Sequence, residues 1–338
     1  MKAAVYQGKQ RFQVKEIATP VPGPKQILVK VDFCGVCGTD VHAFMFDVAQ
    51  PGAVLGHEFS GTVAAIGGEV SEWKVGDRVI GGGGEPPVGQ EPATRVHPRY
   101  NYRTMGFQHG RTRAYAEYTL MEPWEPLRLP KGVPPEAGAL CEPSAVAVHA
   151  IRLSGLRLGD SVGIIGAGPI GLLCLQAARA AGASRVFVSE PAPARAQAAR
   201  KLGADLVLDP LKSDVTDGMV QATNGVGPDV VFDCAGIKST LDQAMNTVRR
   251  GGQVTLVAVP WEPLPVLPVD WMAREVRLAT SWGSRPEDWR IALNLMQTGA
   301  LSTASIMSEA SFVPLEKIQS VFEALMKPTT QLQVVVKP

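Results

Sequence analysis

The chain has 338 residues, of which 45% are hydrophobic and 19% are charged, and its formal net charge is +1. This length predicts two domains, since a single hydrophobic core rarely grows beyond ~250–300 residues. The near-zero charge gives no reason to expect a nucleic acid, a membrane surface or an acidic macromolecule as the partner.

Short β-rich runs separated by Gly and Pro turns characterise residues 1–145. The clearest of them are "KAAVY", "QILVKVDF", "GTVAAIG" and "DRVIGG". Apolar runs of this kind, bounded by turn residues, predict strands, so we expect a mostly β domain here. Residues 81–115 are the exception, because they are rich in Gly, Pro and Arg and have no clear period.

Residues 146–284 alternate apolar strand runs with helical patterns, which is typical of a doubly wound parallel sheet. The predicted strands are "SVGIIG", "RVFVSE", "DLVLD", "DVVFDCAG", "QVTLVAV" and "VRLATSW". The predicted helices lie near 169–181, 193–202, 214–223 and 239–249. Two further helices are expected near 286–298 and 314–326, before a final strand in "QLQVVVKP". We expect this tail, 285–338, to return to the first domain.

A glycine fingerprint stands at the end of the first of these strands. Gly166, Gly168 and Gly171 have the spacing G-x-G-x-x-G, and a helical pattern starts at once with Pro169 and Ile170. In a dinucleotide site the first glycine makes a tight turn, the second admits the pyrophosphate, and the third lets helix and strand approach closely. The free N–H groups of the helix N-terminus then face the phosphates. This pattern predicts a dinucleotide cofactor.

Two side chains bear on the choice of cofactor. Glu190 ends the next strand, nineteen residues after Gly171, where a carboxylate can bind the ribose hydroxyls of NAD and repel the 2′-phosphate of NADP. Arg195 lies nearby and could serve a 2′-phosphate or pack on the adenine. Glu190 makes NAD the favoured cofactor over NADP.

Potential metal ligands cluster in "GVCGTDVH", "GHEFSG" and "CEPSAVAVHA", which contribute Cys37, His57, Glu58 and Glu142. Zinc binds Cys sulfur, His nitrogen and carboxylate oxygen, and a catalytic site keeps one exchangeable position. Cys37 is expected in a turn, and the adjacent His57 and Glu58 can reach one ion from a turn or strand end. A structural zinc site at Cys34 and Cys37 is a rival interpretation, but it lacks a second Cys pair.

These motifs, together with "KVGDRV", "GIIGAGPIGLL", "KLGAD", "VVFDCAG" and "VPLEKIQSVFEAL", run in order along nearly the full chain. The whole resembles the zinc-dependent medium-chain alcohol and polyol dehydrogenases, in the branch of the sorbitol, 2,3-butanediol and threonine dehydrogenases. The resemblance implies an α/β chain with a GroES-like, mostly β catalytic domain (1–145 and 285–338) and a Rossmann NAD-binding domain (146–284).

The resemblance also implies residue roles. Cys37 and His57 match the first two catalytic zinc ligands, while Glu58 and Glu142 match acidic positions that bind the metal directly or through water. Thr39 would hydrogen-bond the alcohol oxygen, and His42 would pass the proton onward. Asp40, inside the same motif, is expected to fix the loop.

Two departures from the family's pattern stand out. Most members have a lobe with four closely spaced cysteines that hold a second, structural zinc, but this chain has no cysteine between Cys37 and Cys141. The corresponding stretch offers only Glu85, Glu91, His97 and His109 as ligands. We therefore expect one zinc per chain and a lobe packed by Tyr100, Tyr102 and Phe107. The interval between Cys37 and His57 is also short for the family.

The irregular segment carries five arginines, at 95, 99, 103, 111 and 113, against two glutamates, which gives residues 85–113 a local charge of +3. A solvated loop is one interpretation, and a patch for an anionic substrate group or an acidic surface is the other.

Together these features predict a zinc- and NAD-dependent dehydrogenase for a secondary alcohol, diol or polyol. Alternatives are a zinc-free quinone or enone reductase of the same fold and a non-catalytic dinucleotide-binding protein. The expected partners are a small alcohol or ketone and further copies of the chain, in a dimer or tetramer. The start of the chain lacks an apolar signal core, and five scattered cysteines do not suggest disulfides, so a cytoplasmic protein is expected.

Overall fold

A computed structural model describes residues 1–88, 113–327 and 331–338 of the chain. Its contacts divide the chain into two compact units. The first unit consists of Met1–Glu142, Glu309–Thr329 and Gln333–Pro338, and the second of Pro143–Ser308 and Thr330–Leu332. The first unit is therefore discontinuous in sequence, and the second is inserted into it.

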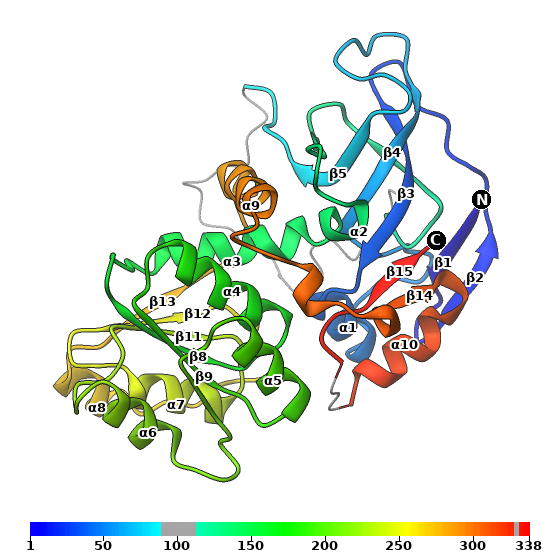
Figure 1. The fold of residues 1–338 in the computed structure, drawn as a ribbon. Coiled ribbons are helices and arrows are strands. Elements are labelled where there is room, and N and C mark those ends of the chain that lie inside the picture. Colours follow the sequence, from blue (N-terminus) through cyan, green and yellow to red (C-terminus); the bar gives the residue numbers. More distant parts are fainter. Residues whose placement is uncertain (89–112, 328–330) are drawn as a thin grey trace. The chain divides into compact units, whose positions relative to one another are not determined.

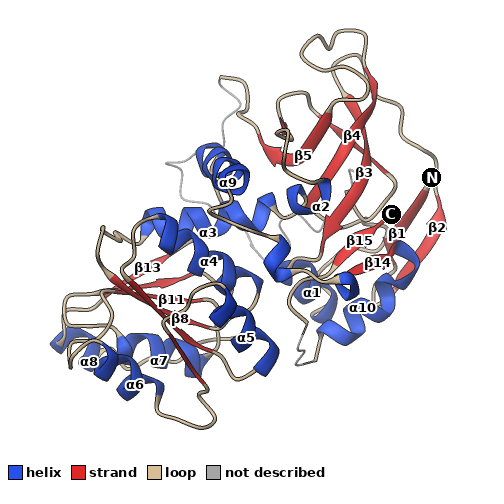
Figure 2. Cartoon of the chain, viewed as in Figure 1, coloured by secondary structure: helices blue, strands red, loops and turns tan. Residues whose placement is uncertain are grey.

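The first unit is built mainly from strands, as Figures 1 and 2 show. Its seven-stranded sheet has the order β14-β15-β3-β4-β5-β7, with β6 also paired to β3, and β1 and β2 form a separate antiparallel pair. The bounds are β1 (Lys2–Tyr6), β2 (Phe12–Glu16), β3 (Ile27–Gly35), β4 (Glu58–Ile66), β5 (Arg78–Gly83), β6 (Tyr118–Met121), β7 (Pro126–Arg128), β14 (Phe312–Pro314) and β15 (Val335–Lys337). Because β15 pairs antiparallel with β3, the predicted return of the final strand to the first domain is confirmed.

Three helices belong to this unit: α1 (Gly38–Met45), α2 (Pro135–Gly138) and α10 (Ile318–Leu325). Helix α1 differs from the expected turn at Cys37, because Cys37 is the N-cap of a helix that runs through the motif. Its apolar residues Val41, Ala43 and Phe44 are buried, and this burial stabilises a helix that is too short to persist alone.

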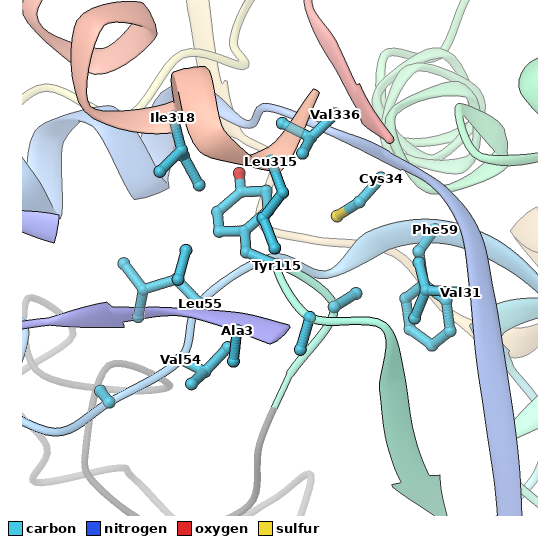
Figure 3. Packing of buried hydrophobic residues seen from close by; sticks show 14 of the residues in the cluster. Ala3, Val31, Cys34, Val54, Leu55, Phe59, Tyr115, Leu315, Ile318 and Val336 are labelled. Atoms are coloured by element: carbon cyan, nitrogen blue, oxygen red, sulfur yellow. The ribbon is translucent and has the colours of Figure 1, made fainter. Parts of the chain in front are cut away.

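An aromatic core holds the first unit together. Phe44 stacks on Phe12 with ring centroids 5.3 Å apart, and Phe322 of α10 meets the edges of both Phe44 and Tyr115. Tyr6 joins the same cluster from β1. Figure 3 shows how the ring of Tyr115 lies among Leu55, Leu315 and Cys34 in this core. The core therefore connects the start, the middle and the end of the chain.

The second unit contains a six-stranded parallel sheet with the order β10-β9-β8-β11-β12-β13. Its bounds are β8 (Ser161–Ile165), β9 (Arg185–Ser189), β10 (Leu206–Leu208), β11 (Val230–Asp233), β12 (Gln253–Leu256) and β13 (Arg277–Thr280). All six strands lie within the predicted runs. The strand order reverses between β9 and β11, on either side of β8, which defines the switch point where such sheets bind ligands.

The helices of this unit agree closely with the periodic patterns. They are α3 (Cys141–Leu153), α4 (Pro169–Ala180), α5 (Pro193–Lys201), α6 (Val215–Ala222), α7 (Lys238–Thr247), α8 (Val269–Ala273) and α9 (Pro286–Thr298). The short α8 was not predicted. Across the described ranges, each helix is too short or too polar to cross a lipid bilayer.

The domain boundary differs from the expected one. Residues 285–308 were expected in the first domain, but they belong to the second unit. The reason lies in α9, where the buried Asp288 contacts Nδ1 of His149 at 2.8 Å and also pairs with Arg152, both on α3. The side-chain amide of Gln176 on α4 likewise accepts a hydrogen bond from the N–H of Ser302 at 2.7 Å.

Candidate functional site

Three of the predicted metal ligands come together in the first unit. Single ligand atoms of Cys37, His57 and Glu58 all lie within 4.8 Å of one another. Cys37 caps α1, His57 precedes β4, and Glu58 is the first residue of β4. Gly56, with φ of +95°, makes the sharp turn before His57, and a side chain there would approach both Tyr115 and Cys34 within 3.0 Å. This backbone conformation favours glycine and brings adjacent residues to one point.

Glu142 stands apart from this cluster. It lies in the first turn of α3 and is partly exposed. Its carboxylate does not share the 4.8 Å group within the described residues, although its charge raises the pKa of Glu58 and the charge of His57 acts to lower the pKa of Glu142. The structure thus brings three of the four predicted ligands into contact and places the fourth nearby.

The electrostatics of the cluster suit a cation. Burial raises the pKa of the Cys37 thiol to about 11, and burial together with the Glu142 charge raises the pKa of Glu58. Burial also raises the pKa of Glu142. Burial lowers the pKa of His57, but the neighbouring Asp40 and Cys37 outweigh it, and the pKa ends well above its usual value. A cation among sulfur, nitrogen and oxygen donors would relieve this crowding of anionic groups, so the donor set fits zinc.

A second layer of residues supports these three side chains. Asp40, which is buried, has its Oδ2 3.5 Å from Nδ1 of His57, and the hydroxyl of Tyr115 donates to the same oxygen at 2.9 Å. The side-chain amide of Gln333, just before β15, donates to Oε2 of Glu58 at 3.4 Å. Asp40 was expected to fix the loop, and its contacts agree with that role.

The two predicted proton-handling residues lie on α1. The hydroxyl of Thr39 donates to Sγ of Cys37 at 3.1 Å. His42 is half-buried, and burial lowers its pKa. Because His42 follows Thr39 by three helical positions, both residues lie on the same side of α1.

The glycine fingerprint of the second unit has the geometry that the sequence predicts. Gly166 has φ of +93°, and a side chain at Gly171 would meet the carbonyl oxygen of Gly166 at 1.9 Å. At Gly168, the N-cap of α4, the one described atom within 4 Å of an added Cβ would be Nη1 of Arg195, 4.0 Å away. Pro169 and Ile170 open the helix, and no side chain caps its N-terminus. The loop therefore leaves open space at the helix end, which fits a phosphate group.

Glu190 and Arg195 flank this loop. Glu190 is buried, and its two carboxylate oxygens accept the N–H groups of Ala167 at 2.7 Å and Ala192 at 2.8 Å. Arg195 on α5 donates through Nη2 to the carbonyl oxygen of Gln331 at 3.3 Å, while its buried Nε has no hydrogen-bond partner among the described residues. Glu190 thus holds the glycine loop, a role that the sequence did not suggest, while its contact with the cofactor ribose stays a prediction.

Comparisons with known proteins agree with this architecture. Residues 23–131 match the alcohol dehydrogenase GroES-like domain, and residues 169–298 match the zinc-binding dehydrogenase family. The chain is 32% identical to the (R,R)-butanediol dehydrogenase of Bacillus subtilis, with 100% of both chains covered. It is 30% identical to the sorbitol dehydrogenase of Homo sapiens over 96% of this chain and 92% of that one.

A solved structure shows the same fold. A zinc-binding dehydrogenase from Sinorhizobium meliloti 1021, bound to NADP, superposes with a TM-score of 0.87 at 32% identity and covers 100% of this chain and 99% of its own. The chain therefore belongs to the zinc-type medium-chain alcohol and polyol dehydrogenase family. It is an oxidoreductase that acts on CH–OH groups, and the α/β fold with GroES-like and Rossmann parts is confirmed.

Sequence reasoning missed three supporting residues. Tyr115 and Gln333 lie 75 and 275 residues from the side chains that they contact, and no local pattern marks either one. Gly35 is the first residue of the "GVCGTDVH" motif. Its short spacing to Cys37 was the only sign in the sequence that it supports the site. The candidates Glu91, His97, His109, Tyr100, Tyr102 and Phe107 lie outside the described residues, as do four of the five arginines. Glu85 is described and is exposed.

Proposed function

We propose that the protein oxidises a secondary alcohol, diol or polyol to a ketone, reversibly, with zinc and NAD. The observation that carries this proposal is the group of Cys37, His57 and the buried Glu58, with the Thr39 hydroxyl beside it. The relatives named for butanediol and sorbitol support the substrate class. A zinc-free reductase has no need for these ligands, and a non-catalytic protein has no need for Thr39 and His42.

The chain's own residues divide the work. We assign one zinc per chain to Cys37 and His57, with Glu58 and Glu142 binding directly or through water. When bound, zinc lowers the pKa of a coordinated hydroxyl. The Thr39 hydroxyl can accept the alcohol proton and donate its own proton onward. Burial lowers the pKa of His42, so its imidazole is neutral near pH 7 and can receive the proton that Thr39 passes on. We also assign to Glu58 the role of balancing the positive charge of the metal beside these ligands.

In the second unit, we assign the cofactor to the loop of Gly166, Gly168 and Gly171. When bound there, NAD would supply the hydride acceptor, and the residues around the loop would supply orientation and charge. The first turn of α4, with Pro169 and Ile170, would face the pyrophosphate. The carboxylate of Glu190 disfavours a 2′-phosphate, which supports NAD over NADP. Arg195, next to the open space at Gly168, would bind phosphate or pack on adenine.

We further propose a homo-oligomer, dimer or tetramer, formed through the edge strand β13. Large apolar side chains are exposed on and around this strand: Val266, Leu267, Val269, Met272, Leu278 and Trp282. An uncovered edge strand beside exposed apolar residues is suited to pairing with a second copy. The Met272→Asp/Leu278→Asp variant should have a smaller mass by light scattering than the wild type. Unchanged mass would place the interface elsewhere or exclude an oligomer.

The five free thiols support a reducing compartment, and we place the protein in the cytoplasm.

A substrate panel tests the activity. Zinc-loaded protein is mixed with secondary alcohols, vicinal diols and polyols, with NAD⁺ and NADP⁺ in parallel, and formation of the reduced cofactor is followed by absorbance. We expect turnover of at least one member, faster with NAD⁺, and loss of turnover after zinc removal. Activity on enones that survives zinc removal would instead identify a zinc-free reductase.

A further inference from the structure

We propose that Tyr115 is a positioning residue for the metal site, and that it acts on His57 through Asp40. This inference rests on the proposed zinc site and extends it to a residue that touches no ligand atom of the cluster. Its basis is one shared oxygen, Oδ2 of Asp40, which meets the Tyr115 hydroxyl on one side and His57 on the other.

Tyr115, Asp40 and His57 form a chain of contacts, here called the relay, in which Tyr115 and Asp40 are buried and His57 is partly exposed. The Tyr115 hydroxyl donates to Oδ2 of Asp40 at 2.9 Å and lies 3.3 Å from the carbonyl oxygen of Gly35. The same Oδ2 is 3.5 Å from Nδ1 of His57, and Asp40 is 1% exposed. A carboxylate so deeply buried needs donors to remain charged, and Tyr115 supplies one of them.

The relay orients the imidazole. A histidine that donates its Nδ1–H to a carboxylate presents the lone pair of Nε2 on the opposite side of the ring. Such carboxylate partners fix the tautomer and the ring orientation of metal-binding histidines and raise their basicity. Tyr115 holds the Asp40 carboxylate at the place from which it can do this. Loss of the hydroxyl should therefore loosen His57 without removing any ligand.

The backbone and ring of Tyr115 are firmly held. Its N–H donates to the carbonyl oxygen of Leu55 at 2.8 Å, and its own carbonyl accepts from Ala4 at 2.8 Å. The ring packs edge-on against Phe322, with centroids 5.9 Å apart, inside the core shown in Figure 3. Phenylalanine can keep all of these contacts and lacks only the hydroxyl. The substitution Tyr115→Phe therefore removes the hydroxyl's contacts with Asp40 and with the Gly35 carbonyl, and it keeps the packing of the ring.

The chain offers a matched control in the same core. Tyr6 is also fully buried, and its hydroxyl also donates to a carboxylate, that of Asp47. Asp47 accepts the N–H of Lys9 at 2.8 Å with the same oxygen, and it is not a member of the group formed by Cys37, His57 and Glu58. Tyr6→Phe thus removes the same kind of bond from the same core and leaves the relay intact.

The experiment measures zinc affinity by competition with a chromogenic chelator, for the wild type, Tyr115→Phe and Tyr6→Phe. A second measurement records the absorption spectrum of the cobalt-substituted proteins, which reports ligand geometry. We expect Tyr115→Phe to weaken zinc binding about tenfold, the lower range for loss of such a supporting contact, and to shift the cobalt bands. Tyr6→Phe should change neither, although both variants lose similar thermal stability.

A double-mutant cycle tests the route through Asp40. If Tyr115 acts by way of Asp40, Tyr115→Phe should have no further effect on zinc affinity in the Asp40→Asn background. Equal zinc affinity in Tyr115→Phe and Tyr6→Phe, or full additivity with Asp40→Asn, would overturn the inference. The Cys37→Ser variant distinguishes a failure of this inference from a failure of the proposed zinc site. Wild-type zinc affinity in Cys37→Ser would refute the zinc site itself.

Discussion

Gly35 and Glu58 face each other across the paired strands β3 and β4 with no room for a side chain between them. A Cβ at position 35 would stand 2.2 Å from Oε2 of Glu58 and 2.9 Å from Leu140. The absence of a side chain at Gly35 therefore sets the position of the Glu58 carboxylate in the metal cluster.

This contact predicts opposite outcomes at two glycines near Cys37. Gly35→Ala must displace Glu58 and should cost about 1–3 kcal/mol of stability through overpacking, with a parallel loss of zinc affinity. Gly38→Ala is the matched control, since a Cβ there meets no atom of the described residues within 4 Å and Gly38 begins α1. Thermal unfolding and zinc titration of both variants check this. Wild-type zinc affinity in Gly35→Ala would show that Glu58 is not needed at its observed place.

Removal of a proposed ligand should separate turnover from cofactor binding. Cys37→Ala and His57→Ala are each expected to abolish turnover and to leave NADH fluorescence titration nearly unchanged, because the glycine loop belongs to the other compact unit. Elemental analysis should give about one zinc per chain in the wild type and near zero in Cys37→Ala. Two zinc ions per chain, one of them retained in Cys37→Ala, would reveal a second site.

Zinc affinity should rise with pH. Burial raises the pKa of Cys37 to about 11, so the metal-free thiol is protonated at neutral pH, and zinc must displace that proton. Affinity should therefore increase about tenfold per pH unit between about pH 6 and pH 8 from the thiol alone. The raised pKa of Glu58 adds to the slope in the same direction. Calorimetry in buffers of different ionisation enthalpy counts the released protons, and a slope of zero would contradict this account.

Glu190 should affect both the cofactor and the loop that holds it. Glu190→Ala removes the acceptors of the Ala167 and Ala192 N–H groups, so we expect weaker NAD binding and lower stability. Glu190→Gln keeps one acceptor oxygen and removes the charge, so it should improve kcat/KM for NADP relative to NAD with less loss of stability. An unchanged ratio in both variants would mean that Glu190 serves the loop alone.

The elements that could be predicted from the sequence are those whose signal is local. Helices α4, α6, α7 and α9 have clear apolar periodicity, and the three glycines encode a loop geometry that depends on their own φ angles and spacing. The motif around Cys37 did not reveal α1, because that helix has only eight residues and depends on burial of Phe44. Periodicity also identified α9 without showing which unit it joins, since that depends on the Asp288 contacts with α3.

The support of the metal cluster could not be predicted, because it depends on contacts between distant parts of the chain. The ligands themselves were recognisable from their chemistry and their motifs. Tyr115, however, precedes a strand with no unusual pattern. It contributes to the site through the hydrogen bond that its hydroxyl donates to Asp40. Gln333 likewise reaches Glu58 only because β15 pairs with β3.

The discontinuous first unit has a consequence for the order of events on the ribosome. The second unit is nearly complete in sequence once residue 308 has been made, whereas the first still lacks α10, β14 and β15. The unit that includes Met1 is thus expected to finish folding after the second unit, because Gln333 must be made before it can reach Glu58. Nascent chains stalled after residue 308 should resist protease in the second unit and retain zinc poorly. Stable zinc binding is then expected only after residues 309–338 have joined the first unit.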